Sequence, residues 1–280
     1  MGKAVILFYY FYPSLHTPHG SHTEVRQNTI TQMSNTESKD QLLSLIRQKK
    51  PMTLGQQARL VLQLSTPAIL AQLTTTMMQY IDASMVGSMG AEASASIGIV
   101  ETTVWLLGSI CSATAAGFYV QVSHQLGADD GPQARDTLRQ GIVSVLAMSM
   151  ILSLTALAVS PFLPVWLGGN ADINASASAY FAIIAMGIPA FQFSIFGSGM
   201  LRSSGNMVVP SVMSVVMMSL DVVFNSFLIF PTRTVSILGT AFTMPGAGLS
   251  VEGAAIGTVS AECIAASITM YLLCFRRDRK

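Results

Sequence analysis

Long apolar segments separated by short polar ones dominate the chain from residue 53 onward. Six such segments lie at residues 60–86, 96–120, 140–165, 178–200, 208–230 and 252–275. Each is about 20 to 27 residues long, which suits a helix that crosses about 30 Å of hydrocarbon at about 1.5 Å per residue. The alternating polar positions that mark membrane-spanning strands are absent from them. The pattern therefore predicts six transmembrane helices that form one bundle.

The first 52 residues follow a different pattern. The apolar stretch AVILFYYFY is about nine residues long, too short for a span that needs about twenty, and polar residues follow it. The three histidines of HTPHGSH do not share a helix face, because a proline and a glycine separate them, so we expect no metal site there. We expect a disordered or poorly ordered tail over residues 1–52 and a six-helix transmembrane bundle over residues 53–280.

Composition supports a membrane class. The chain is 51% hydrophobic and only 10% charged, whereas a soluble domain carries about 25% charged residues. A net charge of +1 gives no reason to expect nucleic acid as a partner. Neither a nucleophile–base pair, nor an HExxH motif, nor a phosphate-binding loop occurs in the sequence. We therefore expect an all-α integral membrane protein that is not an enzyme.

Lysine and arginine residues flank the predicted spans asymmetrically. Eleven of them lie near the spans on one side, and Arg233 is alone on the other. Because cytoplasmic loops carry the excess of basic residues, this side is expected to be cytoplasmic. The orientation places both termini in the cytoplasm, for a multi-pass protein of the cell (inner) membrane. The eleven residues are Arg47, Lys49, Lys50, Arg59, Arg135, Arg139, Arg202, Arg276, Arg277, Arg279 and Lys280.

Four acidic residues lie inside or near the predicted spans, namely Asp82, Glu101, Asp221 and Glu262. A charged aspartate near the centre of a spanning helix costs about 2.5–3.5 kcal/mol on insertion scales. Glu101 is close enough to the outer interface to be solvated there, and Asp82 lies toward the outer part of its helix. Asp221 and Glu262 lie mid-span between apolar residues, which makes them functional candidates.

Asp221 and Asn225 are four residues apart and therefore share a helix face. If Asp82 of the first helix faces them, two carboxyl groups and an amide line one pocket. Two carboxylates that are buried together cannot readily both be ionised, so such a pair would hold one proton near neutral pH. Exchange of that proton, or of Na+, for an organic cation is the chemistry of an antiporter. The expected coupling ion is H+ or Na+, and no resident cofactor is expected.

Two further features concern helix geometry. Gly253, Gly257 and Ala261 form a face of small residues suited to close helix packing. Pro67 lies one turn into the first predicted span, where it removes a backbone hydrogen bond and permits a bend.

Four stretches in order resemble the multidrug and toxic compound extrusion (MATE) family. STPAILAQLTTTMMQYIDASMVGSMGAEASASIG is similar to its first helix and following loop, and HQLGADDGPQARDTLRQG to its loop between helices two and three. GMLRSSGNMVVPSVMSVVMMSLDVVFNSFLIF resembles its helix 4–5 junction and fifth helix, and GLSVEGAAIGTVSA the start of its sixth. The resemblance covers about residues 55–275.

The resemblance implies a secondary active transporter with two six-helix bundles, which exports cationic drugs in exchange for H+ or Na+. Asp82 falls on the family's first-helix aspartate, which takes part in cation coupling, and Pro67 falls on its helix-bending proline. Asp221 and Asn225 fall on a fifth-helix pair that usually reads Asn and then Asp or Asn, so the acid here has moved by about one turn.

Two residues of the sixth helix complete the candidate site. Thr258 matches a sixth-helix threonine near the family's cation site. Glu262 stands where a neutral polar residue is more usual, which makes it a candidate extra proton carrier.

The resemblance covers only the first of the family's two bundles, and the family's substrate cleft forms between them. We expect a truncated N-terminal half of an efflux transporter for organic cations, surrounded by membrane lipid. The alternatives are pairing with a second six-helix half and formation of a homodimer. A lipid-linked saccharide flippase of the same superfamily is less favoured, because the spans contain no Lys or Arg to meet phosphate. A non-transporting membrane subunit or remnant is the third hypothesis.

Overall fold

The computed structural model describes residues 51, 53–237 and 240–275 of the 280-residue chain. The expected tail over residues 1–52 therefore lies, apart from Pro51, outside the described residues. Contacts divide the chain into two units, Met1–Gln63 and Leu64–Lys280. The packing and the sites described below belong to the second unit.

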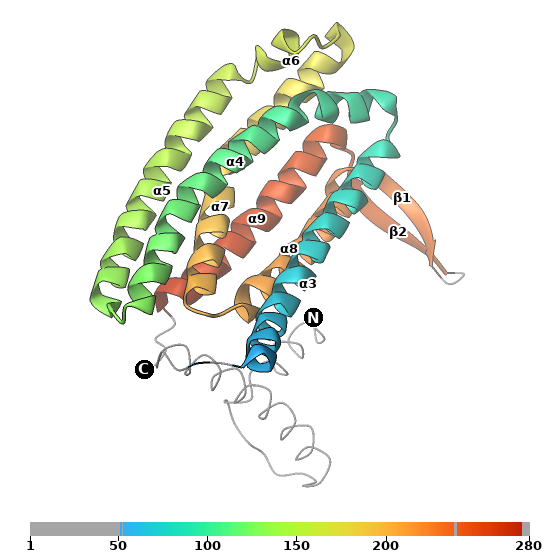
Figure 1. The fold of residues 1–280 in the computed structure, drawn as a ribbon. Coiled ribbons are helices and arrows are strands. Elements are labelled where there is room, and N and C mark those ends of the chain that lie inside the picture. Colours follow the sequence, from blue (N-terminus) through green and yellow to red (C-terminus); the bar gives the residue numbers. More distant parts are fainter. Residues whose placement is uncertain (1–50, 52, 238–239, 276–280) are drawn as a thin grey trace. The chain divides into compact units, whose positions relative to one another are not determined.

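Helices make up most of the described chain (Figure 1). Between the last two long helices, two antiparallel strands form a hairpin that the sequence analysis did not predict. The helices are α3 (Leu54–Gly87), α4 (Ala91–Gly127), α5 (Gly131–Val159), the short α6 (Leu163–Trp166), α7 (Ala171–Ser203), α8 (Val208–Leu228) and α9 (Ser250–Phe275), and the strands are β1 (Pro231–Ile237) and β2 (Thr240–Ala247).

Five of the described helices, α4, α5, α7, α8 and α9, are long and apolar enough to cross a membrane. Large apolar side chains such as Val143, Ile151 and Met186 remain exposed on them, as expected where lipid replaces water. The six predicted segments are mainly helical, but the predicted span 140–165 is divided, because α5 ends at Val159 and α6 begins at Leu163. Helix α3 does not reach the same apolarity as the others, because glutamines, threonines and Asp82 interrupt its apolar residues. The prediction of an all-α integral membrane protein is confirmed.

Local sequence signals set where the helices begin. The Asp130 carboxylate accepts a hydrogen bond from the backbone N–H of Gln133 at 3.1 Å and caps α5, with proline in the first turn. The Asn206 side chain accepts from the backbone N–H of Val209 at 3.1 Å at the start of α8. Gly90, between α3 and α4, has a φ of 119°, which only glycine adopts without strain. The predicted spans ended where apolarity ended, whereas α4 and α7 continue for several residues beyond.

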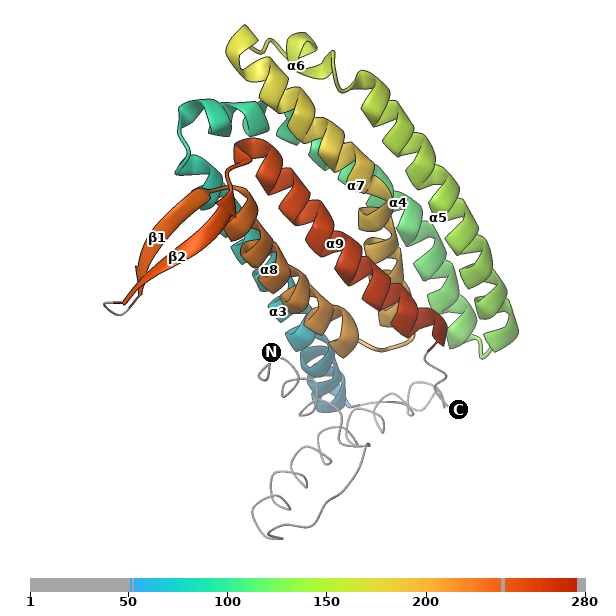
Figure 2. The ribbon, with the colours of Figure 1, turned by 180° about the vertical axis from the view of Figure 1, so that it is seen from behind.

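Helix α7 packs against α4, α5 and α9, and α9 in turn packs against α8. Figure 2 shows α7 with α9 on one side and α5 on the other. The hydroxyl group of Ser153 on α5 donates to the backbone carbonyl of Ala185 on α7 at 2.8 Å, and both residues are buried. A Cβ built on Gly187 of α7 would lie 2.6 Å from the Val259 side chain of α9. These helices therefore pack closely enough to fix the side chains between them.

The predicted face of small residues on α9 contacts α8. A Cβ on Gly253 would lie 2.7 Å from the backbone carbonyl carbon of Leu228, and a Cβ on Gly257 would lie 3.2 Å from the backbone nitrogen of Asn225. Only glycine allows this approach, because any larger residue would separate the two helices. The expectation of close packing is confirmed for these two glycines, and the contact brings α9 next to the polar face of α8.

Candidate cation site

The structure brings Asp82 of α3 together with Asp221 and Asn225 of α8. The four-residue spacing places the two α8 side chains on one face, as the sequence predicted. The Asn225 side-chain nitrogen donates to Oδ1 of Asp82 at 3.0 Å and to Oδ2 of Asp221 at 3.1 Å. A single amide group therefore links both carboxyl groups.

Burial and neighbouring groups distinguish the two carboxyl groups. Asp221 is 0% exposed and Asn225 is 1% exposed, whereas Asp82 is half-buried. The Asp221 carboxyl group also contacts the Asp82 carboxyl group and the hydroxyl group of Thr258 on α9. The site thus combines two carboxyl groups, an amide and a hydroxyl group from three helices. Of the two carboxyl groups, that of Asp82 is the more accessible to solvent.

Hydrogen-bond acceptors outnumber donors at this site. An asparagine side chain has two N–H donors, and both bonds of Asn225 go to carboxyl oxygens. Oδ1 of Asp221 and Oδ1 of Asn225 are buried, and no donor in the described part of the chain is in bonding geometry with either. A buried acceptor without a partner costs about 1–3 kcal/mol. A proton, or a hard cation that prefers oxygen ligands, would remove that cost.

Gly257 leaves the space that the Asn225 amide occupies. A Cβ at this position would collide with Oδ1 of Asn225 and would lie 3.1 Å from its Cγ. The sequence assigned Gly257 to helix packing alone. The structure adds a second role, because this glycine sets how close α9 comes to the amide that links the carboxyl groups.

Glu262 lies one helical turn beyond Thr258 on α9 and is 7% exposed. Its carboxyl group contacts the side chain of Ser194 on α7 and is within electrostatic range of Asp221. No hydrogen bond among the described residues joins Glu262 to Asp82 or Asn225. The structure therefore places Glu262 near the linked group but in its own surroundings, between α9 and α7.

Pro67 lies inside the continuous helix α3. Its backbone carbonyl accepts a hydrogen bond from the hydroxyl group of Ser211 on α8 at 2.8 Å. The same hydroxyl group contacts the backbone carbonyl of Met207 at 2.8 Å. The residue expected to bend α3 is thus connected to the first turns of α8, the helix that carries Asp221 and Asn225.

Three residues near the site were not predicted from the sequence. Ser194 contacts Glu262, Ser211 contacts Pro67, and Tyr180 of α7 lies within electrostatic range of Asp82 and Asp221. Serines are frequent in these helices, and most of them donate to a carbonyl of their own helix, as Ser219 does. The only available signal is a polar residue in an apolar span, and it does not say which helix lies opposite.

Comparisons with known proteins identify the family. The MatE family model matches residues 67–227, more than half of the chain. A Shewanella oneidensis protein named FAD transporter is 25% identical over 217 residues, which cover 77% of this chain and 45% of that protein. A Thermotoga maritima protein named probable multidrug resistance protein NorM is 21% identical over 218 residues, which cover 78% of this chain and 44% of that protein. The chain spans about half the length of these relatives, which are transporters rather than enzymes.

Solved structures share the fold. A MOP superfamily transporter from Pyrococcus furiosus, whose binding pocket is described as having reverse polarity, matches with a TM-score of 0.66 at 21% identity and covers 79% of this chain and 45% of that one. A MATE structure in the straight conformation matches with a TM-score of 0.68 at 20% identity, over 79% of this chain and 46% of that one. Because the family model covers residues 67–227, this multi-pass membrane chain belongs to the MATE (MatE) family.

Proposed function

We propose that this chain supplies the cation-coupling bundle of a secondary active exporter, which exchanges H+ or Na+ for organic cations such as drugs. The observation that carries the proposal is the Asn225 amide, which links the carboxyl groups of Asp82 and Asp221, while Oδ1 of Asp221 and Oδ1 of Asn225 itself have no donor among the described residues. The relatives named as multidrug resistance proteins support the class of cargo.

The coupling ion acts by changing the electrostatic repulsion between the carboxyl groups of α3 and α8. Asp82 belongs to α3 and Asp221 to α8, so loss of a bound cation leaves two negative charges facing each other across the helix pair. Two unit charges about 4 Å apart repel by about 4 kcal/mol at an effective dielectric constant of about 20. At about 1.4 kcal/mol per factor of ten, this repulsion shifts a conformational equilibrium by roughly a thousandfold. Binding of H+ or Na+ removes the repulsion and favours the packed arrangement.

Glu262 is proposed as an additional proton carrier next to the linked carboxyl groups. It is nearly fully buried and lies within electrostatic range of Asp221. A proton on Glu262 lowers the negative charge near Asp221, so its occupancy would modulate cation affinity at the linked pair.

The bundle is proposed to work in the inner membrane with both termini in the cytoplasm, in line with the eleven basic residues on one side and one on the other. A second six-helix bundle would complete the substrate cleft, as expected for a chain that spans about half the length of its relatives. A partner half or a second copy of the chain could provide it.

Cation binding to the purified chain tests the proposal directly. Na+ binding is measured by isothermal calorimetry, and proton binding by pH-dependent intrinsic fluorescence. Asp82→Asn and Asp221→Asn should each weaken binding by at least about tenfold, since a hydrogen-bonded charged group contributes about 1.5–3 kcal/mol. Asp172→Asn is the matched control, because Asp172 is an exposed acid in the first turn of α7. Wild-type affinity for Na+ and protons in both Asp82→Asn and Asp221→Asn would refute the proposal.

A second class of cargo is favoured by one comparison. The Shewanella relative is named FAD transporter, and FAD is a phosphate-bearing dinucleotide rather than a cation. Cells that express the chain together with a second bundle can be assayed for export of a cationic dye and for release of FAD. Dye export that Asp221→Asn abolishes supports the organic-cation proposal, and FAD release without dye export replaces it.

A further inference from the structure

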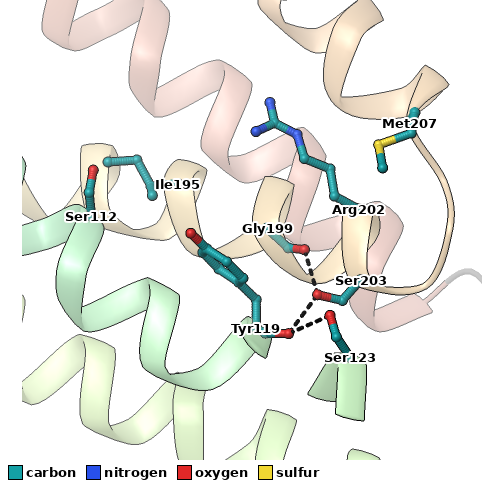
Figure 3. Close-up of a pocket in the computed structure, with 8 residues that line it drawn as sticks. All are labelled: Ser112, Tyr119, Ser123, Ile195, Gly199, Arg202, Ser203 and Met207. Atoms are coloured by element: carbon teal, nitrogen blue, oxygen red, sulfur yellow. Dashed lines mark hydrogen bonds between the residues drawn. The ribbon is translucent and has the colours of Figure 1, made fainter. Parts of the chain in front are cut away.

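A second polar pocket lies between α4 and α7 and shares no residue with the cation site. Its volume is about 440 Å³, within the range of about 300–1,000 Å³ that is usual for small-molecule sites. Figure 3 shows the side chains that line it. They are Ser112, Tyr119, Ser123, Ile195, Gly199, Arg202, Ser203 and Met207.

One wall of this pocket is fixed by hydrogen bonds around a single carbonyl group. The hydroxyl groups of Ser203 and Ser123 donate to the backbone carbonyl of Tyr119 at 2.7 Å and 2.9 Å. The Ser203 hydroxyl group also contacts the carbonyl of Gly199 at 3.1 Å. A Cβ on Gly199 would collide with the Tyr119 ring, so glycine lets this ring lie against α7. The pocket is therefore held by contacts between α4 and α7.

The remaining polar groups of the pocket are donors that face open space. Among the described residues, the Arg202 guanidinium group forms no ion pair, and the hydroxyl groups of Tyr119 and Ser112 have no hydrogen-bond partner. Arg202 and Ser112 are exposed and Tyr119 is partly buried, so these donors are open to a ligand that enters the pocket. Figure 3 shows the Arg202 guanidinium group and the Tyr119 hydroxyl group away from the serine–carbonyl cluster. No acidic side chain lines the pocket. The pocket thus presents one positive charge and two free hydroxyl groups.

We propose that this pocket binds a phosphate group. The planar guanidinium group matches two phosphate oxygens with parallel hydrogen bonds, and the hydroxyl groups of Tyr119 and Ser112 supply further donors. Arg202 lies in the last turn of α7, where a spanning helix reaches the level of phospholipid headgroups. A cation in the last turn also stabilises the helix end, but that effect does not require a pocket lined with hydroxyl groups. The phosphate belongs either to an anionic lipid or to a soluble compound.

Binding measurements on the full purified chain test this site. The detergent-solubilised chain is titrated with short-chain phosphatidylglycerol, with FAD and with inorganic phosphate, and phosphatidylcholine serves as the zwitterionic comparison. Arg202→Gln should weaken binding of the preferred ligand by at least about tenfold, because hydrogen bonds to charged groups are the strong ones. Tyr119→Phe keeps the ring and removes one donor, so it should weaken binding by roughly two- to tenfold. Arg135→Gln is the matched control, since Arg135 is an exposed cation outside the pocket.

The outcomes separate the two phosphate sources. Selective loss of phosphatidylglycerol binding in Arg202→Gln identifies a lipid site, and selective loss of FAD or inorganic phosphate binding identifies a soluble ligand. Equal loss in Arg135→Gln and Arg202→Gln, or no binding of any of the three ligands by the wild-type chain, overturns the proposal. Tyr119→Phe keeps the test decisive if Arg202→Gln does not fold. Na+ and proton binding should be unchanged in Tyr119→Phe, so this site and the cation site succeed or fail separately.

Discussion

Replacing Gly257 with alanine should damage cation binding more than it damages the fold. The added Cβ would collide with Oδ1 of Asn225 and approach its backbone nitrogen to 3.2 Å. The Asn225 side chain is the group that the new Cβ meets first, so rotation of this amide relieves the collision most directly. Such a rotation breaks at least one of the two hydrogen bonds from the amide to Asp82 and Asp221.

The size of the effect follows from those bonds. A hydrogen bond to a charged group contributes about 1.5–3 kcal/mol. At about 1.4 kcal/mol per factor of ten, losing one should reduce cation affinity by about ten- to 150-fold. Overpacking a closely packed site also lowers the free energy of unfolding, typically by about 1–3 kcal/mol. Calorimetric titration with Na+ and thermal unfolding in detergent measure the two effects on one preparation.

Gly253→Ala is the matched control, because its added Cβ would crowd the same α8–α9 contact at Leu228 without meeting the Asn225 amide. It should lower thermal stability by a similar amount and leave the Na+ affinity unchanged. Gly117→Ala, whose Cβ meets nothing within 4 Å, should change neither quantity. A folded Gly257→Ala variant with wild-type affinity would refute the reasoning, because the amide would then not need its present position.

Three further substitutions test other contacts. Ser211→Ala removes the hydrogen bond to the Pro67 carbonyl and should lower the free energy of unfolding by about 0.6 kcal/mol, the average for such bonds in membranes. Backbone amides of α3 near Pro67 should then exchange hydrogen faster, and unchanged exchange would contradict this prediction. Gln192→Met should raise the melting temperature, because Gln192 is 0% exposed and neither of its amide atoms has a partner among the described residues. Removing such a group relieves about 1–3 kcal/mol, and a lower melting temperature would mean that the amide does have a partner. Gly141→Ala places a Cβ 2.8 Å from the Phe196 ring and should lower the free energy of unfolding by about 1–3 kcal/mol, measured by thermal unfolding. An unchanged melting curve would mean that the Phe196 ring moves aside without cost.

Periodicity and residue type predicted the parts of the molecule that depend on one helix at a time. The six long helices follow from apolar runs of bilayer length, and Asp221 shares a face with Asn225 because they are four residues apart. The small-residue face at Gly253 and Gly257 indicated close packing without naming α8 as the partner. Each of these inferences needs only the geometry of a single helix.

Contacts between helices could not be read in the same way. Ser194 is one of many serines in apolar helices, and only the packing of α7 on α9 puts it against Glu262. The β1–β2 hairpin was missed because the search was for long apolar segments, and its strands have 7 and 8 residues. The pocket around Arg202 was not predicted for a related reason. Arg202 lies just outside the predicted fourth span, so the sequence used it as evidence for membrane orientation and not as a candidate ligand-binding residue.

The order of acid and amide on α8 has a physical consequence for the candidate cation site. Position 225 lies against both acids, and it carries an amide whose two N–H groups donate to the two carboxyl groups at once. A carboxylate at this position could only accept, and it would repel both acids. The amide therefore lets Asp221 stay fully buried while remaining connected to the accessible Asp82. Because every linked group belongs to α3, α8 or α9, cation binding should be measurable in this chain alone.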